Sequence, residues 1–260
     1  MHGLAADFFS RHPELSLAAL GASANAQALD LKPAGVPATF LPAEEHGALV
    51  LQYRELNQLA FGALGTPSWV VSDLYLLPGA IGLLRCPARL LEDSARERLG
   101  LPDEALTVGA AYYAAPSVVS GVFIGVSLLS FVRGIRAGMW AKMLTLRMLR
   151  ARRLRGVAQW HNPSVRVHTR LGPLRLVGRV PGAHEYVEQS FLYETELEDE
   201  ARQVAAMERR LTVAPTMRVS VKDTAALRRL LERAEAGEVL HLVPPGLEEG
   251  HVLVREGPLE

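Results

Sequence analysis

The stretch that decides the fold runs from Ala105 to Val132 and reads ALTVGAAYYAAPSVVSGVFIGVSLLSFV, without a charged side chain. Proline, serine and glycine interrupt it at 116–121, and the halves on either side are rich in Val, Ile, Tyr and Phe. Such a composition, broken in the middle, favours two buried strands joined by a turn. We therefore expect strands at Thr107–Ala115 and Val122–Phe131.

The same stretch is also long enough to cross a bilayer as one helix, and basic residues follow it. A single-span membrane protein with its span at 105–132 is therefore the alternative reading. The break in the middle favours the strands, because proline and glycine pairs punctuate a chain at turns.

Periodic patterns on both sides of this stretch predict an alternation of helices and strands, which is typical of an α/β fold. Residues 1–45 carry several prolines and read as a loop-rich entry. The expected helices are Glu44–Ala60, Glu92–Leu99, Met139–Arg153 and Ser164–Leu171, and the expected strands are 69–71, 74–77, Ile81–Leu84, Gly156–Trp160, Leu174–Arg179 and Gln189–Glu196. Beyond Leu197 we expect a charged helix at Glu198–Arg210, a strand at Met217–Val221, a helix from Asp223 or Thr224 to Ala236, and strands at Val239–Val243 and Val252–Val254.

The composition is that of a globular protein, with 260 residues, 49% of them hydrophobic, and 28 basic against 28 acidic side chains. Dominant disorder is excluded, because disordered chains combine low hydrophobicity with high net charge. A single cysteine, Cys86, cannot form an internal disulfide and fits a reducing cytoplasm. We read it as a buried structural residue. The N-terminus lacks a basic flank followed by an apolar core, so we expect no signal peptide and a cytoplasmic location.

Charge is distributed unevenly along the chain. The segment Arg133–Arg155 is basic and has no acidic residue, whereas 185–200 is acidic. An anionic partner of the basic segment is expected, and it is either a ligand, a nucleic acid or the acidic segment folded back. Nucleic acid is disfavoured, because the interleaved aromatic residues of a single-strand platform are missing.

A glycine-bearing loop, Arg133–Gly138, joins the second expected strand to the next helix. At such a junction backbone N–H groups and the helix N-terminus converge on an anion, most often a phosphate. Two arginines in the loop, Arg133 and Arg136, add positive charge. The alternative is a tight connection whose glycines serve only the turn.

Three segments of the chain carry a family resemblance: SFVRGIRAG at 130–138, RRLRGVAQWHNP at 152–163 and RVHTRLGPL at 166–174. In this order they resemble the GCN5-related N-acetyltransferase (GNAT) superfamily. Its core runs as a long strand, a pyrophosphate loop, a helix, a strand, an Asn-containing loop, a short helix and an apolar closing hairpin. The segment FLYETEL at 191–197 is similar to the last strand of that hairpin. The resemblance covers about residues 105–197.

The loop can be aligned with the family pattern in two frames. The pattern is Gln or Arg, two residues, Gly, one residue, and Gly or Ala. Starting at Arg133, the chain has Arg136 where the middle glycine stands and Gly138 at the end. A shifted frame makes Gly138 the middle glycine, with Ile135 first and Trp140 last.

The resemblance implies an α/β fold with a GNAT-like mixed central sheet flanked by helices. It implies a loop-rich segment at 1–45, an acyltransferase domain at 46–197 and a small C-terminal α/β extension at 198–260. The implied activity is direct transfer of an acyl group from acetyl-CoA or another acyl-CoA to an amine. The residues implied to bind the cofactor are Leu128, Leu129, Arg133, Gly134, Arg136, Ala137, Gly138 and Asn162, with the backbone amides near Leu128 and Leu129 polarising the thioester carbonyl.

The resemblance also suggests catalytic residues. His168 falls where the family often has a tyrosine that protonates the leaving thiolate, and histidine can hold a proton near neutral pH. The glutamates that the family often uses as a base are absent from Val122–Phe131, so Asp73, Tyr112, Tyr113 and His161 remain as candidates for the general base. No metal-ligand spacing is present, so we expect no metal. The expected acceptor is a small-molecule or peptide amine, without nucleic acid or membrane, and the C-terminal extension is expected to cover the acceptor site or to form a homodimer. The alternative is a non-catalytic protein that keeps the fold and binds coenzyme A or another partner.

Overall fold

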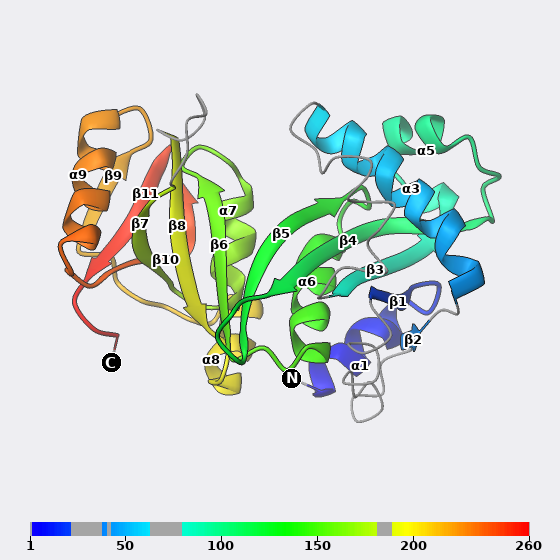
Figure 1. Cartoon of the computed structure of the whole chain (residues 1–260), viewed down its shortest axis with the longest axis horizontal. Helices are drawn as coiled ribbons and strands as arrows, with labels where there is room; N and C mark the ends of the chain where they lie inside the picture. Colours follow the sequence, from blue (N-terminus) through cyan, green and yellow to red (C-terminus); the bar gives the residue numbers. More distant parts are fainter. Residues whose placement is uncertain (1, 22–37, 41–42, 63–79, 181–188, 260) are drawn as a thin grey trace. The chain divides into compact units, whose positions relative to one another are not determined.

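The computed structural model describes residues 2–21, 38–40, 43–62, 80–180 and 189–259 (Figure 1). Its chain forms two compact units. The N-terminal unit consists of His2–Gly121 and Gly125–Ala151, and the C-terminal unit consists of Val122–Ile124 and Arg152–Glu260. The expected strands at 69–71 and 74–77 lie outside the described residues. The domain bounds 46–197 and 198–260 stay predictions.

The N-terminal unit is a sheet with helices packed against it. Its strands are hydrogen-bonded in the order β2-β1-β3-β4-β5, with β1 parallel to β2 and antiparallel to β3, which is itself antiparallel to β4. The elements are α1 (His2–Arg11), β1 (Ser16–Gly21), β2 (Ala38–Phe40), α3 (Ala43–Phe61), β3 (Ala80–Pro87), a 3₁₀ helix (Ala88–Leu90), α5 (Asp93–Leu99), β4 (Leu106–Pro116), β5 (Val122–Ser130) and α6 (Ala137–Met148).

The two strands expected in the uncharged stretch are confirmed as β4 and β5. A glycine with positive φ, Gly121, lies in the turn between them. The membrane-spanning helix proposed as the alternative for 105–132 is therefore wrong, since these residues form strands. Nor does any other helix in the described ranges combine the length and the apolar character needed to cross a bilayer.

Helices α3 and α6 contact opposite faces of β5. Tyr53 of α3 shares a hydrogen bond of 2.5 Å with Ser127 through their hydroxyl oxygens. Gly138 of α6 lies against Ser130, whose Cβ would be 3.0 Å from a Cβ built at Gly138. Because successive residues of a strand point to opposite faces, residues 127 and 130 face opposite sides.

Residues 1–45, expected to be loop-rich, contain α1, β1 and β2 among the residues described. Helix α1 is short, and short helices depend on tertiary packing for their stability. Its Phe8 supplies that packing, because the ring stacks on Trp140 of α6 with centroids 4.4 Å apart. A partner so distant in sequence leaves no local pattern.

Two expected helices have different ends. Helix α6 stops at Met148 instead of Arg153, and Arg150 beyond it has a φ of 50°, which reverses the chain before the next strand. The helix expected at Ser164–Leu171 divides into α7 (Ser164–His168) and a 3₁₀ helix, η4 (Thr169–Leu171). In both cases the hydrophobic pattern continues past the point where the backbone changes conformation.

The C-terminal unit is a second group of strands, in the order β6-β8-β7-β10-β11-β9 after the first three residues of β5. Residues 122–124 of β5 pair in parallel with 153–155 of β6, and the other neighbours are antiparallel. The elements not yet named are β6 (Arg153–Gln159), β7 (Leu174–Arg179), β8 (Ser190–Glu196), α8 (Glu200–Met207), β9 (Met217–Ser220), α9 (Thr224–Glu235), β10 (Leu240–Glu248) and β11 (His251–Glu256). Together the units bear out the expected α/β class and mixed strand pairing.

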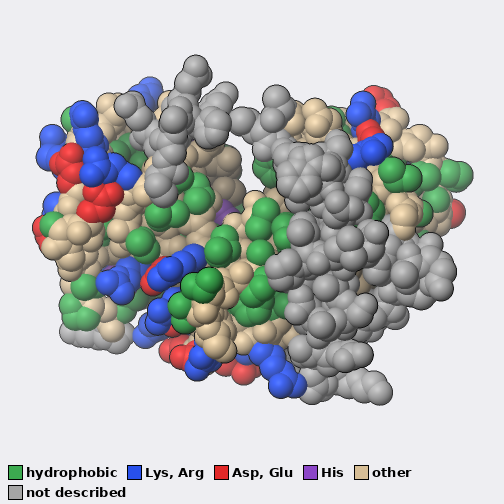
Figure 2. Space-filling view, in the orientation of Figure 1, with side chains coloured by type: hydrophobic (Ala, Val, Ile, Leu, Met, Phe, Trp, Pro, Cys, Tyr) green, Lys and Arg blue, Asp and Glu red, His purple; other side chains and the backbone are tan. Residues whose placement is uncertain are grey.

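The acidic segment does fold back on the basic one within the C-terminal unit. In the β6–β8 ladder Arg153 lies opposite Glu196 and Arg155 opposite Glu194. Arg153 donates from Nε to Glu196 Oε1 over 2.7 Å, and Arg155 forms an ion pair with Glu194. These arginines thus have acidic partners from the chain itself. Basic and acidic side chains also lie side by side over α9 (Figure 2), where Arg179 forms an ion pair with Glu235.

The last part of the chain follows its local signals with one exception. Asp223 caps α9 by accepting a hydrogen bond of 2.9 Å from the backbone N–H of Ala226, as expected from its position. The run Pro244–Gly246 follows the strand expected at Val239–Val243, and in the structure it lies inside the longer β10. The ladder with β11 shifts its register there, between Leu242 and Leu247, so the prolines occupy an irregular part of a strand.

Cys86 is buried in β3, as its apolar surroundings predict. Burial raises the pKa of its thiol to about 12, with a smaller contribution from Glu14. A thiol held neutral in this way is a poor nucleophile. We conclude that Cys86 has a packing role.

Candidate active site

The loop between β5 and α6 is anchored at its start by backbone hydrogen bonds. Phe131 donates its N–H to the carbonyl of Gly109 in β4 over 2.8 Å, and its own carbonyl accepts from the N–H of Glu92 over 2.7 Å. The next residue, Val132, forms an isolated bridge with Leu91. The end of β5 is therefore held from two sides before the chain turns.

Arg136 occupies the left-handed region, with φ 56° and ψ 38°, and is the N-cap of α6. This conformation costs an ordinary residue about 1–2 kcal/mol and costs glycine almost nothing. In the frame that starts at Arg133, the family pattern has glycine at this position. The backbone thus keeps a glycine-like shape although the residue is arginine, which favours that frame over the one centred on Gly138.

Gly138 permits a close approach between the start of α6 and the end of β5. A Cβ at this position would lie 3.0 Å from Cβ of Ser130 and 3.5 Å from Cδ1 of Leu128. Contacts of that kind leave little room for a side chain. Gly134, by contrast, is exposed and has a φ of 81°, so it serves the turn.

The start of α6 has the features of an anion-binding site. The first N–H groups of a helix have no partner within the helix, and the macrodipole adds partial positive charge. No side chain caps α6, and its first turn has no acidic residue. Arg133 is 81% exposed and lies 3.2 Å from Glu92, an exposed ion pair that a stronger anion can replace. These groups fit the pyrophosphate of a nucleotide-type ligand.

Sequence reasoning missed the hydrogen bond between Tyr53 and Ser127. The pair lies beside the two residues whose amides are predicted to act on the thioester, Leu128 and Leu129. Leu129 is buried and Leu128 is half-buried. Tyr53 lies 74 residues before Ser127 in the sequence, so no local pattern marks the contact.

The second missed residue is Lys142, which lies 1% exposed in α6. Its Nζ is 5.5 Å from the ring centroid of Tyr112, the predicted base, which is itself buried in β4. Burial lowers the pKa of Lys142 to about 7. The signal that marks it is a single charged residue in the otherwise uncharged segment Ala137–Leu146.

The remaining predicted residues are in the C-terminal unit or outside the described residues. His168 ends α7 and is buried, with its ring centroid 5.2 Å from that of Tyr193 in β8. Asn162 accepts a hydrogen bond of 2.8 Å at Oδ1 from the backbone N–H of Ser164, at the start of α7. Asp73 lies outside the described residues. Within the described ranges, no three His, Cys, Asp or Glu side chains gather as a metal site would require.

The turn formed by Asn162 provides a test of its structural role. Replacing it with alanine is expected to lower the free energy of unfolding by about 1 kcal/mol, because the N–H of Ser164 loses its acceptor. Asn162→Asp keeps the oxygen and should keep the stability. Urea unfolding followed by circular dichroism measures both variants, and equal stability of all three proteins would contradict the role.

Among known proteins, this chain has matches to solved structures. No protein-family model matches it, and no curated protein does. A GCN5-related N-acetyltransferase from Brucella melitensis is 13% identical, covering 66% of this chain and 80% of its own, with a TM-score of 0.41. A putative acetyltransferase from Acinetobacter baylyi is 10% identical, covering 72% and 95%, with a TM-score of 0.39.

A third solved structure is a probable acetyltransferase of the GNAT family from Chromobacterium violaceum, 14% identical, covering 60% of this chain and 84% of its own, with a TM-score of 0.37. These three structures are similar to this chain over 60–72% of its length.

Proposed function

We propose that this protein is an acyl-coenzyme A-dependent N-acyltransferase, with acetyl-CoA as its first candidate donor. The observation that carries the proposal is the loop before α6. Arg136 holds the backbone conformation of a glycine at the position where the resembling family has one, and Gly138 brings the helix start against β5. A cytoplasmic location belongs to the same proposal.

In this proposal the backbone N–H groups of Ala137 and Gly138, with the side chains of Arg133 and Arg136, hold the pyrophosphate. Acyl-CoA supplies an activated thioester carbonyl, which the amine attacks. The amides near Leu128 and Leu129 polarise that carbonyl, since donors aimed at a developing oxyanion stabilise a transition state.

Proton transfers are assigned to side chains. His168 is proposed to protonate the leaving thiolate, as a histidine can near neutral pH. Tyr112 or Asp73 is proposed to take a proton from the amine. The acceptor is a small-molecule or peptide amine.

Calorimetric titration of the full chain with acetyl-CoA and with free CoA tests the donor site. We expect saturable binding of both, weakened about tenfold or more by Arg136→Glu, because a carboxylate at the loop repels the pyrophosphate. Arg228 is exposed on α9, and Arg228→Glu is the matched control, expected to bind like the parent.

The outcomes separate the readings. If neither acetyl-CoA nor CoA binds to the folded protein, the proposed enzyme activity is contradicted. The same holds if Arg136→Glu and Arg228→Glu weaken binding equally. Binding followed by release of free CoA thiol with a panel of amines supports the transferase. Binding with no turnover on any amine favours the non-catalytic CoA-binding alternative.

A further inference from the structure

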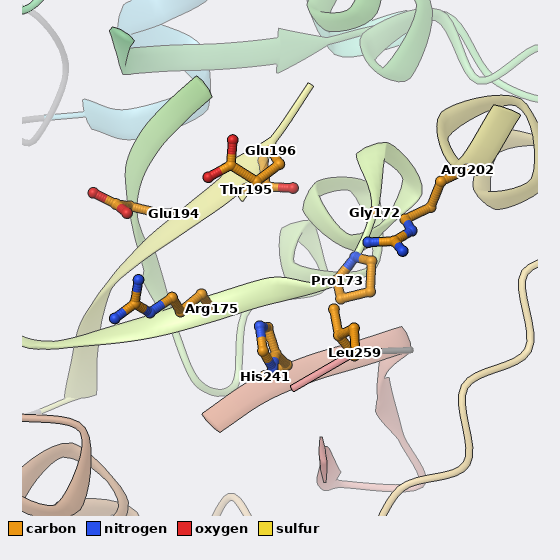
Figure 3. A pocket seen from close by; sticks show the side chains of 9 residues that line it. All are labelled: Gly172, Pro173, Arg175, Glu194, Thr195, Glu196, Arg202, His241 and Leu259. Carbon is orange, nitrogen blue, oxygen red and sulfur yellow. The ribbon is translucent and has the colours of Figure 1, made fainter. Parts of the chain in front are cut away.

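A cavity of about 80 Å³ lies inside the C-terminal unit and belongs to no part of the proposed acyl-transfer machinery (Figure 3). Four elements contribute charged or titratable groups: Arg175 from β7, Glu194 and Glu196 from β8, Arg202 from α8 and His241 from β10. A second cavity of about 240 Å³ is lined by Arg255 and by Leu211–Ala214. Pro173, Arg202 and Leu259 line both, so the two cavities adjoin.

The strand register places cationic side chains in one row across the sheet. Arg175 is paired with His241 in the β7–β10 ladder, and His241 is paired with Arg255 in the β10–β11 ladder. Residues directly opposite in neighbouring strands lie on the same face with their Cβ atoms about 5 Å apart. Two guanidinium groups therefore flank one histidine.

The acidic residues nearest this row are already engaged. Glu194 lies opposite Arg175 in β8, but it forms its ion pair with Arg155 of β6. Glu196, which also lines the cavity, is paired with Arg153. Arg175 and Arg255 have no ion pair in the described part of the chain. The two arginines and two glutamates that line the first cavity balance in formal charge, and Arg202 also lies 3.5 Å from Asp199. Arg255 in the lining of the second cavity adds one positive charge without an acidic partner among the described residues.

Buried polar atoms around the cavities lack partners. Nδ1 of His241, which is 8% exposed, and Oγ1 of Thr195, which is 2% exposed, form no hydrogen bond among the residues the structure describes. Nε of Arg255 is likewise buried without an acceptor in those ranges. A buried polar group left unsatisfied costs about 1–3 kcal/mol, so such groups in native proteins ordinarily have water or a ligand.

The pKa of His241 is affected by its burial and by the charges around it. Burial lowers its pKa first, and the charges of Arg175 and Arg202 lower it further, while the backbone of Gly257 acts in the opposite direction. In Figure 3 the His241 ring stands on its strand beside Leu259, and the Arg202 side chain extends toward Pro173. The Arg175 side chain extends the other way, on the side of Glu194, so the guanidinium group on the Pro173 side of the cavity is that of Arg202.

We propose that this cavity binds the oxyanion group, carboxylate or phosphate, of a small metabolite, with Arg202 and His241 as its ligands. Guanidinium groups suit both oxyanions because they offer paired N–H donors. The remainder of the metabolite extends into the adjoining cavity, where Arg255 and the segment Leu211–Ala214 contact it. The volume of the first cavity is several times the minimum that one water needs, which leaves room for such a group.

The test is calorimetric titration with inorganic phosphate and with succinate, at constant ionic strength. The full chain carries Arg136→Glu throughout, so that binding at the loop before α6 does not contribute. We expect saturable binding of one of the two probes, and the probe that binds identifies the oxyanion. Arg202→Gln and His241→Leu should each weaken it about tenfold or more, since a bond to a charged group is lost.

Arg228→Gln is the control and should leave the affinity within about twofold, because Arg228 is exposed and lines neither cavity, so its charge is screened by solvent. Thermal unfolding verifies that each variant is folded. Arg202 is half-exposed, so Arg202→Gln decides the matter if His241→Leu does not fold. The proposal would be overturned if phosphate and succinate both gave heats no larger than those of potassium chloride. Equal affinities of all variants for the probe would also overturn it.

Discussion

Gly156→Val is expected to destabilise the C-terminal unit by about 3 kcal/mol, the upper range for overpacking a core. Gly156 in β6 lies opposite Tyr193 in β8, and the ring of Tyr193 covers it. A Cβ at Gly156 would lie 2.4 Å from Oη and 2.5 Å from Cζ of that ring. The ring cannot move freely, because Tyr193 is 2% exposed and packs beside His168.

Urea unfolding of the purified variant measures this effect. Gly47→Val is the matched control, because Gly47 lies in α3 with no atom within 4 Å of a built Cβ. Its stability should change by less than about 1 kcal/mol, the range of helix propensities. Tyr193→Leu added to Gly156→Val should recover part of the loss, since it removes the colliding atoms. An unchanged urea midpoint for Gly156→Val would refute the packing argument.

Lys142→Met is expected to stabilise the protein and to remove much of its pH dependence above neutrality. Burial lowers the pKa of Lys142 to about 7, whereas an unfolded lysine titrates near 10.4. Between these values the unfolded state binds the extra proton. The free energy of unfolding therefore rises with pH by up to about 1.4 kcal/mol per unit across this window.

The direction of the Lys142 pKa shift determines the pH at which Lys142→Met gains most stability. Below about pH 7 the folded protein carries a buried ammonium group, and the full penalty of its desolvation, about 5 kcal/mol, is present. Methionine has no charge to desolvate, so Lys142→Met should gain most at pH 6 and least near pH 10.

Unfolding curves at pH 6, 7, 8 and 9.5 measure this difference. Lys222→Met makes the same substitution at an exposed lysine and should show no such trend. A constant difference between Lys142→Met and the parent over this range would contradict a titrating, buried Lys142. The same result would remove the reason to associate Lys142 with Tyr112.

Local patterns in the sequence determined much of the architecture. The proline and glycine break at 116–121 separates β4 from β5, because these residues cannot continue a strand ladder. Asp223 and Gly237 delimit α9, since a side-chain acceptor and a positive φ satisfy helix ends locally. The family pattern of the loop could also be read, up to a choice between two frames.

Features that depend on the backbone or on distant partners were not readable. The frame of the loop follows from the left-handed conformation of Arg136, which no rule for arginine predicts. Helix α1 was missed because its stacking partner Trp140 is far along the chain. The burial of Lys142 depends on which face of α6 meets β3 and β4.

The oxyanion cavity shows most clearly the difference between what the sequence determines and what the tertiary structure determines. Arg175, His241 and Arg255 are unremarkable in the sequence, where each is one polar residue in an alternating strand. They form a row only because β7, β10 and β11 are neighbours in one register. Local propensity acts over a few residues and determines where strands begin and end, whereas strand order and register depend on the burial of whole faces, which only the tertiary structure decides.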